Sequence, residues 1–175
     1  VEIMKKDLAV SPVIGVLLML TLTLIIAAIV NSYAGGLMET EPKAPAVTLQ
    51  TALHQNYPDN SLEIVHTSGD PLPVSSIKLI IRPSETFGFN APQQLSQIDK
   101  SYITNVSDPS QTWSSGITAF KPGDLAIISA ENLNHIQSNV DREFWVTNSS
   151  NLGKTFLLEV YYKNSMISRN EVLIE

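Results

Sequence analysis

Residues 8–38 read LAVSPVIGVLLMLTLTLIIAAIVNSYAGGLM, and this stretch without a charged side chain decides the fold. Its central run from Val13 to Val30 is apolar apart from Gly15, Thr21 and Thr23. A run of this length reaches the threshold for a membrane-spanning helix. If all of residues 8–38 are helical, the helix is about 46 Å long, against about 30 Å for a hydrocarbon core. A simple membrane anchor does not need the extra length.

The charged residues beside this stretch predict how it lies in a membrane. Lys5 and Lys6 precede the apolar run, and no basic residue follows it until Lys43. Because basic residues stay on the cytoplasmic side, we expect the N-terminus inside and residues 39–175 outside.

Both ends of the expected helix carry local signals. Ser11 before Pro12 is typical of a helix start, with serine as the cap and proline in the first turn, where no N–H is needed. Gly35 and Gly36 weaken the far end and predict a hinge or a cap there.

Three interpretations of this stretch compete. A secretory signal peptide would be removed, and Ser32-Tyr33-Ala34 has the small-x-small pattern of a cleavage site, but the apolar run exceeds the roughly 7–15 residues typical of such a peptide. A single-pass membrane anchor is the second interpretation. The third is a helix that leaves the bilayer and packs against copies of itself.

The free-energy cost of exposing its apolar side chains means that this helix cannot be surrounded by water. The run from Val13 to Val30 holds 13 large apolar side chains. Exposing each costs about 1.5–3 kcal/mol, so about 20–40 kcal/mol in total as an upper bound. The run is apolar on every side and not along one stripe, which suits the core of a helix bundle. A repeated head-to-tail contact that does not close into a ring gives a helical filament.

The residues themselves resemble a known family. The segment AVSPVIGVLLM, from Ala9 to Met19, is similar to the N-terminal stretch of archaeal type IV pilins, and TLTLIIAAIV continues the pattern to Val30. HTSGDPLPV at residues 66–74 and PGD at residues 122–124 resemble recurrent stretches of the same family. The resemblance implies a filament whose core is a bundle of these helices, an exterior of immunoglobulin-like β-domains, and a role in adhesion and surface attachment to host or abiotic surfaces.

The same resemblance implies a processed N-terminus. In that family a membrane prepilin peptidase removes a short charged leader, and a membrane platform with its ATPase assembles the filament. Residues 1–7 are leader-like, with Lys5, Lys6 and Asp7 as the charged run and Ala9 near the expected cut. Leu8 stands where a charged residue often precedes the cut, so the bond that is cleaved stays open.

Several residues of the helix are candidates for packing in the filament core. These are Ser11, Pro12, Gly15, Leu17, Leu20, Leu24, Ala27, Ala28, Gly35 and Gly36. The small ones permit close helix approach, although ordinary apolar composition explains them equally well. The hydroxyls of Thr21 and Thr23 have two alternatives, a hydrogen bond across helices or one to their own backbone.

After a proline-containing linker at residues 39–45, the period of the sequence changes from helix to strand. Apolar and polar residues alternate in seven segments at residues 47–53, 62–64, 77–81, 124–130, 144–146, 155–163 and 166–174. Asn164-Ser165 predicts a two-residue hairpin turn. We therefore predict an α+β chain with one long hydrophobic helix followed by an immunoglobulin-like β-sandwich at residues 46–175.

Residues 83–116 predict long surface loops. They contain Pro83, Pro92 and Pro109, and an irregular helix is expected around residues 92–98. Two asparagines, Asn105 and Asn148, begin N-glycosylation acceptor patterns in predicted loops outside the membrane. The family resemblance adds that such filaments are often N-glycosylated, so a covalent glycan is the one added group that we expect.

No pattern predicts a catalytic or metal site, and we expect neither enzyme activity nor a cofactor. The three histidines lack metal-ligand spacing, and the chain has no cysteine. The formal net charge is -6, with the whole excess in residues 39–175, which disfavours nucleic-acid binding. Aromatic side chains have two readings, a carbohydrate-binding platform or ordinary core packing: Trp113, Tyr57, Tyr161 and Tyr162. We predict a filament subunit for adhesion, with a non-polymerising surface binding protein as the alternative.

Overall fold

The computed structural model describes residues 10–37, 43–55 and 60–175. The chain divides into two compact units, Val1–Lys43 and Ala44–Glu175, and each is described by itself. The predicted leader, with Lys5, Lys6, Asp7 and Ala9, lies outside the described residues. Its boundaries therefore stay a prediction.

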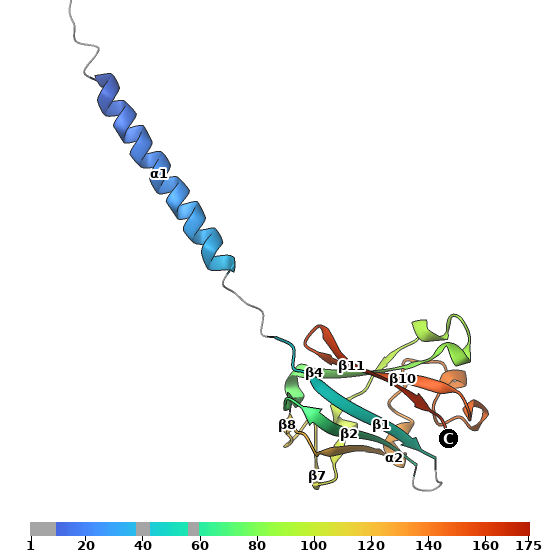
Figure 1. The fold of residues 1–175 in the computed structure, drawn as a ribbon. Coiled ribbons are helices and arrows are strands. Elements are labelled where there is room, and N and C mark those ends of the chain that lie inside the picture. Colours follow the sequence, from blue (N-terminus) through green and yellow to red (C-terminus); the bar gives the residue numbers. More distant parts are fainter. Residues whose placement is uncertain (1–9, 38–42, 56–59) are drawn as a thin grey trace, which may run out of the picture. The chain divides into compact units, whose positions relative to one another are not determined.

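The first unit contains a single continuous helix, α1, from Val10 to Leu37 (Figure 1). Its 28 residues span about 42 Å at about 1.5 Å per residue. The helix begins before Ser11, so the prediction of Ser11 as the cap is wrong, whereas Pro12 does lie in the first turn. Gly35 and Gly36 are also helical, which contradicts a hinge or cap at that point. The cost of about 1 kcal/mol for a glycine in a helix does not interrupt it here.

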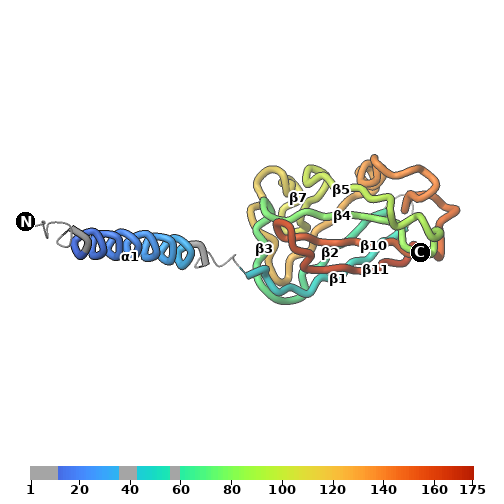
Figure 2. Tube along the Cα trace, turned by 90° about the horizontal axis from the view of Figure 1, so that it is seen from above, coloured from blue at the N-terminus to red at the C-terminus, as the bar shows by residue number. Residues whose placement is uncertain are grey.

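The second unit is built from two antiparallel sheets (Figures 1 and 2). The first sheet has the order β1 (Val47–His54), β2 (Ser61–Gly69), β9 (Leu125–Ser129), β6 (Thr104–Asn105) and β7 (Asp108–Thr112). The second has the order β11 (Ser165–Leu173), β10 (Thr155–Tyr162), β4 (Ile77–Pro83) and β5 (Ser96–Gln97). A small third pair joins β3 (Leu72–Pro73) to β8 (Ala119–Phe120).

Short helical turns connect the strands. One is the α-helix α2 (Ala130–Leu133). The others are 3-10 turns at Val74–Ser76, Glu85–Phe87, Ala91–Gln93, Lys100–Tyr102, Arg142–Phe144 and Ser149–Asn151.

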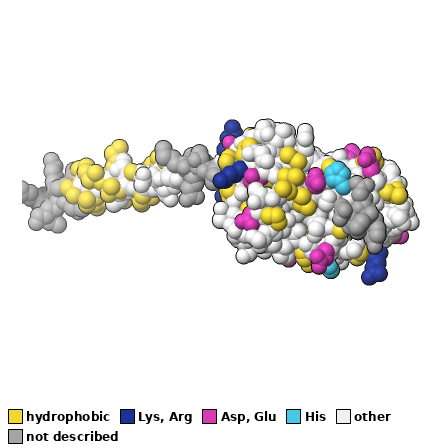
Figure 3. Space-filling model, turned by 90° about the horizontal axis from the view of Figure 1, so that it is seen from below, with side chains coloured by type: hydrophobic (Ala, Val, Ile, Leu, Met, Phe, Trp, Pro, Cys, Tyr) yellow, Lys and Arg dark blue, Asp and Glu magenta, His cyan; other side chains and the backbone are white. Residues whose placement is uncertain are grey.

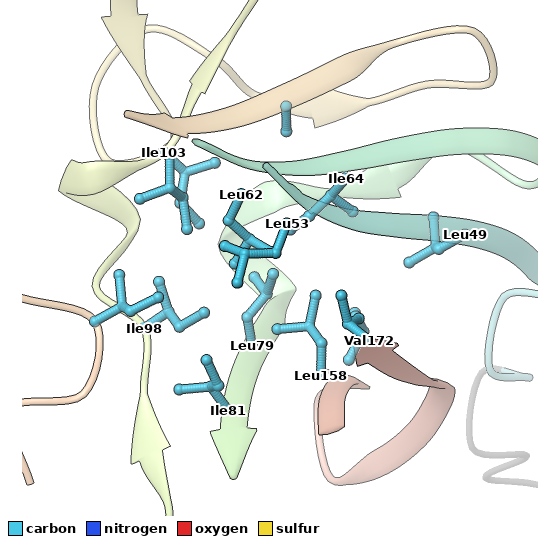
Figure 4. Close-up of a cluster of buried hydrophobic side chains, with 14 of the residues drawn as sticks. Leu49, Leu53, Leu62, Ile64, Leu79, Ile81, Ile98, Ile103, Leu158 and Val172 are labelled. Atoms are coloured by element: carbon cyan, nitrogen blue, oxygen red, sulfur yellow. The ribbon is translucent and has the colours of Figure 1, made fainter. Parts of the chain in front are cut away.

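One hydrophobic core lies between the two main sheets. Alternation along β2 buries Leu62 and Ile64, and alternation along β4 buries Leu79 and Ile81. Figure 4 shows these side chains in one cluster with Leu158 of β10. The domain is therefore a β-sandwich after a long apolar helix, as the sequence predicts.

The strand order invites comparison with the immunoglobulin sandwich. Within the sheets, the orders β1-β2-β9-β6 and β11-β10-β4 match the ABED and GFC orders of that fold. The order alone does not establish an immunoglobulin-like domain, which stays a prediction.

Three local predictions are wrong. Residues 144–146 form no strand, because Arg142–Phe144 is a 3-10 turn. The hairpin turn is one residue earlier than expected, since Tyr162 pairs with Ser165 and Lys163 takes the positive φ of 53°. Residues 83–116 are not only long surface loops, because they supply β5, β6 and β7, and the helix expected around residues 92–98 is only the 3-10 turn Ala91–Gln93.

Candidate functional site

The surface of α1 is the most unusual feature of the described residues. Every described side chain from residue 12 to residue 35 is exposed, and the large apolar ones range from 49% for Ile14 to 71% for Met19. The segment Pro12–Gly35 is long and apolar enough to cross a membrane, and an 18-residue window within it has a mean hydropathy of 3.0. Figure 3 shows apolar side chains, and no charged ones, on the visible face of the described helix. Such a surface is stable only in lipid or against other protein.

The two threonines within the apolar run of α1 do not change this conclusion. The Oγ1 of Thr21 donates to the Leu18 carbonyl at 2.9 Å, and the Oγ1 of Thr23 donates to the Leu20 carbonyl at 2.9 Å. Of the two alternatives for these hydroxyls, the structure shows the bond to their own backbone. Both threonines are therefore satisfied within the helix and need no polar partner outside it.

The predicted packing residues all fall on α1. Leu17, Leu20 and Leu24 are 56%, 55% and 69% exposed. A side chain added at Gly15 or Gly35 would meet no atom within 4 Å, so nothing within the chain requires glycine at either position. The remaining candidates are also helical residues: Ser11, Pro12, Ala27, Ala28 and Gly36. Which of them face a neighbouring helix stays a prediction.

The two glycan candidates lie in different surroundings. Asn105 belongs to β6, is only 4% exposed, and its Oδ1 accepts a hydrogen bond from the Trp113 Nε1 at 2.8 Å. The expectation that Asn105 lies in a surface loop is therefore wrong. Asn148 does lie in a loop, where its Oδ1 accepts from the Ser150 backbone N–H at 3.0 Å.

The predicted aromatic platform does not form around Trp113. This indole is 4% exposed and packs on Phe120, with ring centroids 5.0 Å apart. Tyr161 and Tyr162 are half-buried on β10, and Tyr57 lies outside the described residues. Trp113 is a core residue, which was the alternative reading.

The histidines take structural positions. His66 is fully buried against Phe120, with its Nδ1 3.1 Å from the Phe120 carbonyl oxygen. His54 lies 3.5 Å from a carboxylate oxygen of Glu63, and His135 stacks on Tyr102. Among the described residues, no three His, Asp or Glu side chains come close enough to hold a metal ion.

A buried carboxylate organises the outer face of the second sheet. Glu159 on β10 is 4% exposed and faces Arg82 at 3.0 Å, Arg169 at 3.5 Å and the Tyr161 hydroxyl at 3.1 Å. Burial, and then the hydrogen bond and charge of Glu159, raise the pKa of the Tyr161 hydroxyl, while the two arginines oppose that shift. The sequence gives no sign of this cluster, because its members come from three strands.

A second missed feature is the connection between β9 and β10, residues 130–154. Its backbone is held by buried amide side chains, among them Gln137, whose Oε1 accepts from the Val146 N–H at 2.7 Å. Asn151 donates to the carbonyls of Glu143 and Trp145 at 2.8 and 2.9 Å. This long connection is thus an ordered part of the domain.

Comparison with known families matches residues 8–49 to the archaeal type IV pilin N-terminal domain. The helical part of this chain is therefore similar to an archaeal type IV pilin N-terminal domain. The match covers all of α1 and reaches the first residues of β1, so the pilin resemblance of the sequence is confirmed. With its separate β-domain, the chain has the organisation of a pilin-like subunit.

One relative adds an independent match. A protein of Archaeoglobus fulgidus, described only as uncharacterized, is 37% identical over 76 residues. These residues are 43% of this chain and 53% of the relative. The chain therefore spans about half the length of the relative that it matches.

Proposed function

We propose that this pilin-like chain is the structural subunit of an archaeal type IV pilus-like filament that polymerises through α1 and attaches cells to surfaces. The observation that carries the proposal is the exposure of every described side chain of an apolar helix, in a segment that matches the pilin N-terminal domain. Neither role depends on catalysis or on a cofactor.

Three features of α1 favour a polymer over a plain anchor. The helix is about 42 Å long, whereas a hydrocarbon core requires about 30 Å. It is apolar on all sides, so it can be covered by neighbours in every direction. Its two threonines are satisfied internally, so their hydroxyls need no partner in a dry helix bundle.

The proposal includes a membrane stage before assembly. The subunit is inserted with its N-terminus inside, is processed by a prepilin peptidase, and is then extracted by an assembly platform and its ATPase. The β-domain faces outward, where Asn148, a half-buried loop residue, is the candidate acceptor for a glycan.

The alternative is a single-pass surface binding protein that never polymerises. Cell fractionation separates the two, because filaments are released by shear and sediment without detergent, whereas an anchored monomer stays with the membrane. We expect the chain in the sheared fibres with α1 intact. Its complete retention in the detergent-soluble membrane fraction would refute the filament.

A second experiment tests whether α1 forms the core. Leu24 is 69% exposed in the single chain, and Leu24→Ala leaves the helix apolar enough for membrane insertion. If Leu24 packs against neighbouring helices, the substitution costs about 2–5 kcal/mol per subunit through a cavity. We expect fibres that dissociate at a clearly lower temperature in a sedimentation assay.

The matched control makes the same chemical change on the β-domain. Leu152 is 53% exposed in a loop of that domain, so Leu152→Ala removes the same atoms outside the proposed core. Fibres of Leu152→Ala should dissociate at the wild-type temperature. Equal effects of the two substitutions, or none from either, would argue against a core made of α1.

A further inference from the structure

An open hollow lies at one end of the β-domain. It encloses about 760 Å³ and is lined by the segment between α2 and the turn Arg142–Phe144, together with Trp145. The chain enters the domain beside Val47, at the start of β1. The segment that lines the hollow follows Ser129, the last residue of β9. Ser129 pairs with Ser61 of β2, and Ser61 pairs with His54 at the other end of β1. The hollow therefore lies at the end of the domain away from Val47, where the orange segment is seen in Figure 2.

An aromatic ring and a guanidinium form one wall of the hollow. The half-buried Trp145 is fixed by its Nε1, which donates to the Val140 carbonyl at 2.9 Å. The Arg142 guanidinium stacks 5.5 Å from the centroid of the same ring. In the described part of the chain, this guanidinium makes no hydrogen bond and no ion pair. Its N–H groups are thus held in place and are available to a ligand.

Polar groups with fixed positions form another part of the wall. Asp141 is clamped by Gln94, whose Nε2 donates to Oδ2 at 2.8 Å and whose Oε1 accepts from the Asp141 N–H at 2.9 Å. Asn134 uses its Oδ1 for the Thr147 hydroxyl at 2.8 Å, which leaves its amide N–H groups for another acceptor. The hollow therefore offers both donors and acceptors beside an aromatic surface.

The backbone that carries these groups is preorganised from inside. Gln137 and Asn151 are each 1% exposed, and their amides bind backbone groups of the same connection. Gln55 reaches from the end of β1 and donates to the Val146 carbonyl at 2.6 Å. These amides make the connection rigid without filling the hollow. A rigid site loses less conformational entropy when a ligand binds.

We propose that this hollow binds a hexopyranoside unit of a surface glycan. A pyranose ring has an apolar C–H face that stacks on an aromatic side chain, and its hydroxyl groups both donate and accept hydrogen bonds. Trp145 supplies the first kind of contact, and Arg142, Asp141 and Asn134 supply the second. One arginine beside Asp141 and Glu143 is a poor match for a polyanion.

The inference gives the attachment role a ligand class, and it rests on the proposed function for its biological setting. Its test uses the full chain as monomers in micelles of a detergent without a sugar headgroup. A failure to form filaments therefore does not affect the result, and a failure to bind sugar does not affect the filament experiments.

The two tryptophans provide an internal control. Because the chain contains only Trp113 and Trp145, a ¹H–¹⁵N spectrum has two indole signals, and Trp145→Phe assigns them. The probes are methyl hexopyranosides of glucose, galactose, mannose and glucuronic acid, and methyl N-acetylglucosaminide. We expect at least one to shift the Trp145 signal saturably with a Kd of about 1 mM, while the buried Trp113 signal stays in place.

Variants connect the signal to the hollow. Arg142→Ala and Asn134→Ala should each raise the Kd about tenfold, because each removes hydrogen bonds to the ligand. The charge-matched control Lys121→Ala lies in an exposed turn outside the hollow and should leave the Kd unchanged. Saturable binding that is lost only in the two hollow variants supports the proposal. It is overturned if no glycoside shifts Trp145, if glycerol at the same hydroxyl concentration gives the same shift, or if Lys121→Ala weakens binding equally.

Discussion

Replacing the buried carboxylate of Glu159 by an amide tests the electrostatic organisation of the β-domain. Glu159→Gln preserves the shape of the side chain but removes the charge that faces Arg82 at 3.0 Å and Arg169 at 3.5 Å. Because the Glu159 side chain is only 5% exposed, water cannot replace the lost interaction. The Arg82 guanidinium would then be left without its carboxylate, holding only the bond from its Nη1 to the Pro92 carbonyl.

The two arginines contribute different amounts to the stability that Glu159→Gln is expected to lose. Breaking a buried ion pair from one side costs about 3–5 kcal/mol, and the Arg82 side chain, at 23% exposure, places this pair near the lower value of about 3 kcal/mol. The Arg169 side chain is 53% exposed, so its share is screened by solvent and is about 0.5 kcal/mol. We therefore expect Glu159→Gln to destabilise the domain by about 3 kcal/mol, or about 10 °C in Tm.

Tryptophan fluorescence during urea or thermal unfolding measures this change. Trp113 and Trp145 both lie in Ala44–Glu175, so the signal reports the β-domain without α1. Glu171→Gln on β11 is the matched control, since it makes the same substitution at an exposed position and should cost under about 1 kcal/mol. The reasoning is refuted if Glu159→Gln is as mild as Glu171→Gln, or if Arg169→Gln is as damaging as Glu159→Gln.

Three further predictions follow from the same structure. Residues 44–175, expressed alone, should be a soluble folded monomer with the unfolding midpoint of the full chain, because they contain every buried hydrophobic residue of the described part of the chain; aggregation of the fragment in size-exclusion chromatography would contradict this. Peptide mapping of native material by mass spectrometry should find glycan on Asn148 and none on Asn105, whose side chain is 4% exposed, and the reverse pattern would be incompatible with the folded domain as acceptor. Gly69→Ala should destabilise the domain by at least about 2 kcal/mol in the same fluorescence assay, because φ is +113° there and the new Cβ would collide with the Ala46 carbonyl oxygen; a wild-type midpoint would show that β1 is not held against Gly69.

The helix and the longest strands were predictable from the sequence because each follows one period. An uncharged apolar run admits no other regular structure of that length, and the run did become α1. Strict alternation identified Ile77, Leu79 and Ile81 as one buried face of β4. Both signals are local, so no tertiary information was needed to interpret them.

The prediction of loops at residues 83–116 was wrong because distant partners in the sequence hold the strands of this region in place. Ser96–Gln97 becomes a strand only because β4 offers an edge, and Asn105 becomes buried because β9 pairs with β6. Neither segment has enough length for a visible alternation. Prolines and polar residues correctly indicated breaks in regular structure, but they did not reveal that Ile98, Ile103 and Trp113 reach the core.

The hollow was missed for a related reason. A carbohydrate platform was considered for Trp113, whose neighbours in sequence are polar, but that indole is 4% exposed. Trp145 lies within an apparent strand pattern at residues 144–146, and that pattern does not predict a binding site. The buried amides of Gln137 and Asn151 hold this segment as an ordered loop. Hydrogen bonds from side chains to the backbone produce no periodic pattern of apolar residues, so the sequence does not predict this order.

The two units differ in whether they bury their apolar side chains, and this difference affects how the ligand preference of the hollow can change. The β-domain encloses its own hydrophobic core, while the described part of α1 buries none of its side chains. A substitution at Arg142 or Asn134 therefore alters the hollow without touching a residue of that core or of α1. If the filament and the glycan site are both correct, the ligand preference can change through a few loop residues while assembly through α1 stays constant. Variants of the hollow should then form fibres with wild-type thermal stability, and a loss of fibres in these variants would show that the hollow itself is a contact between subunits.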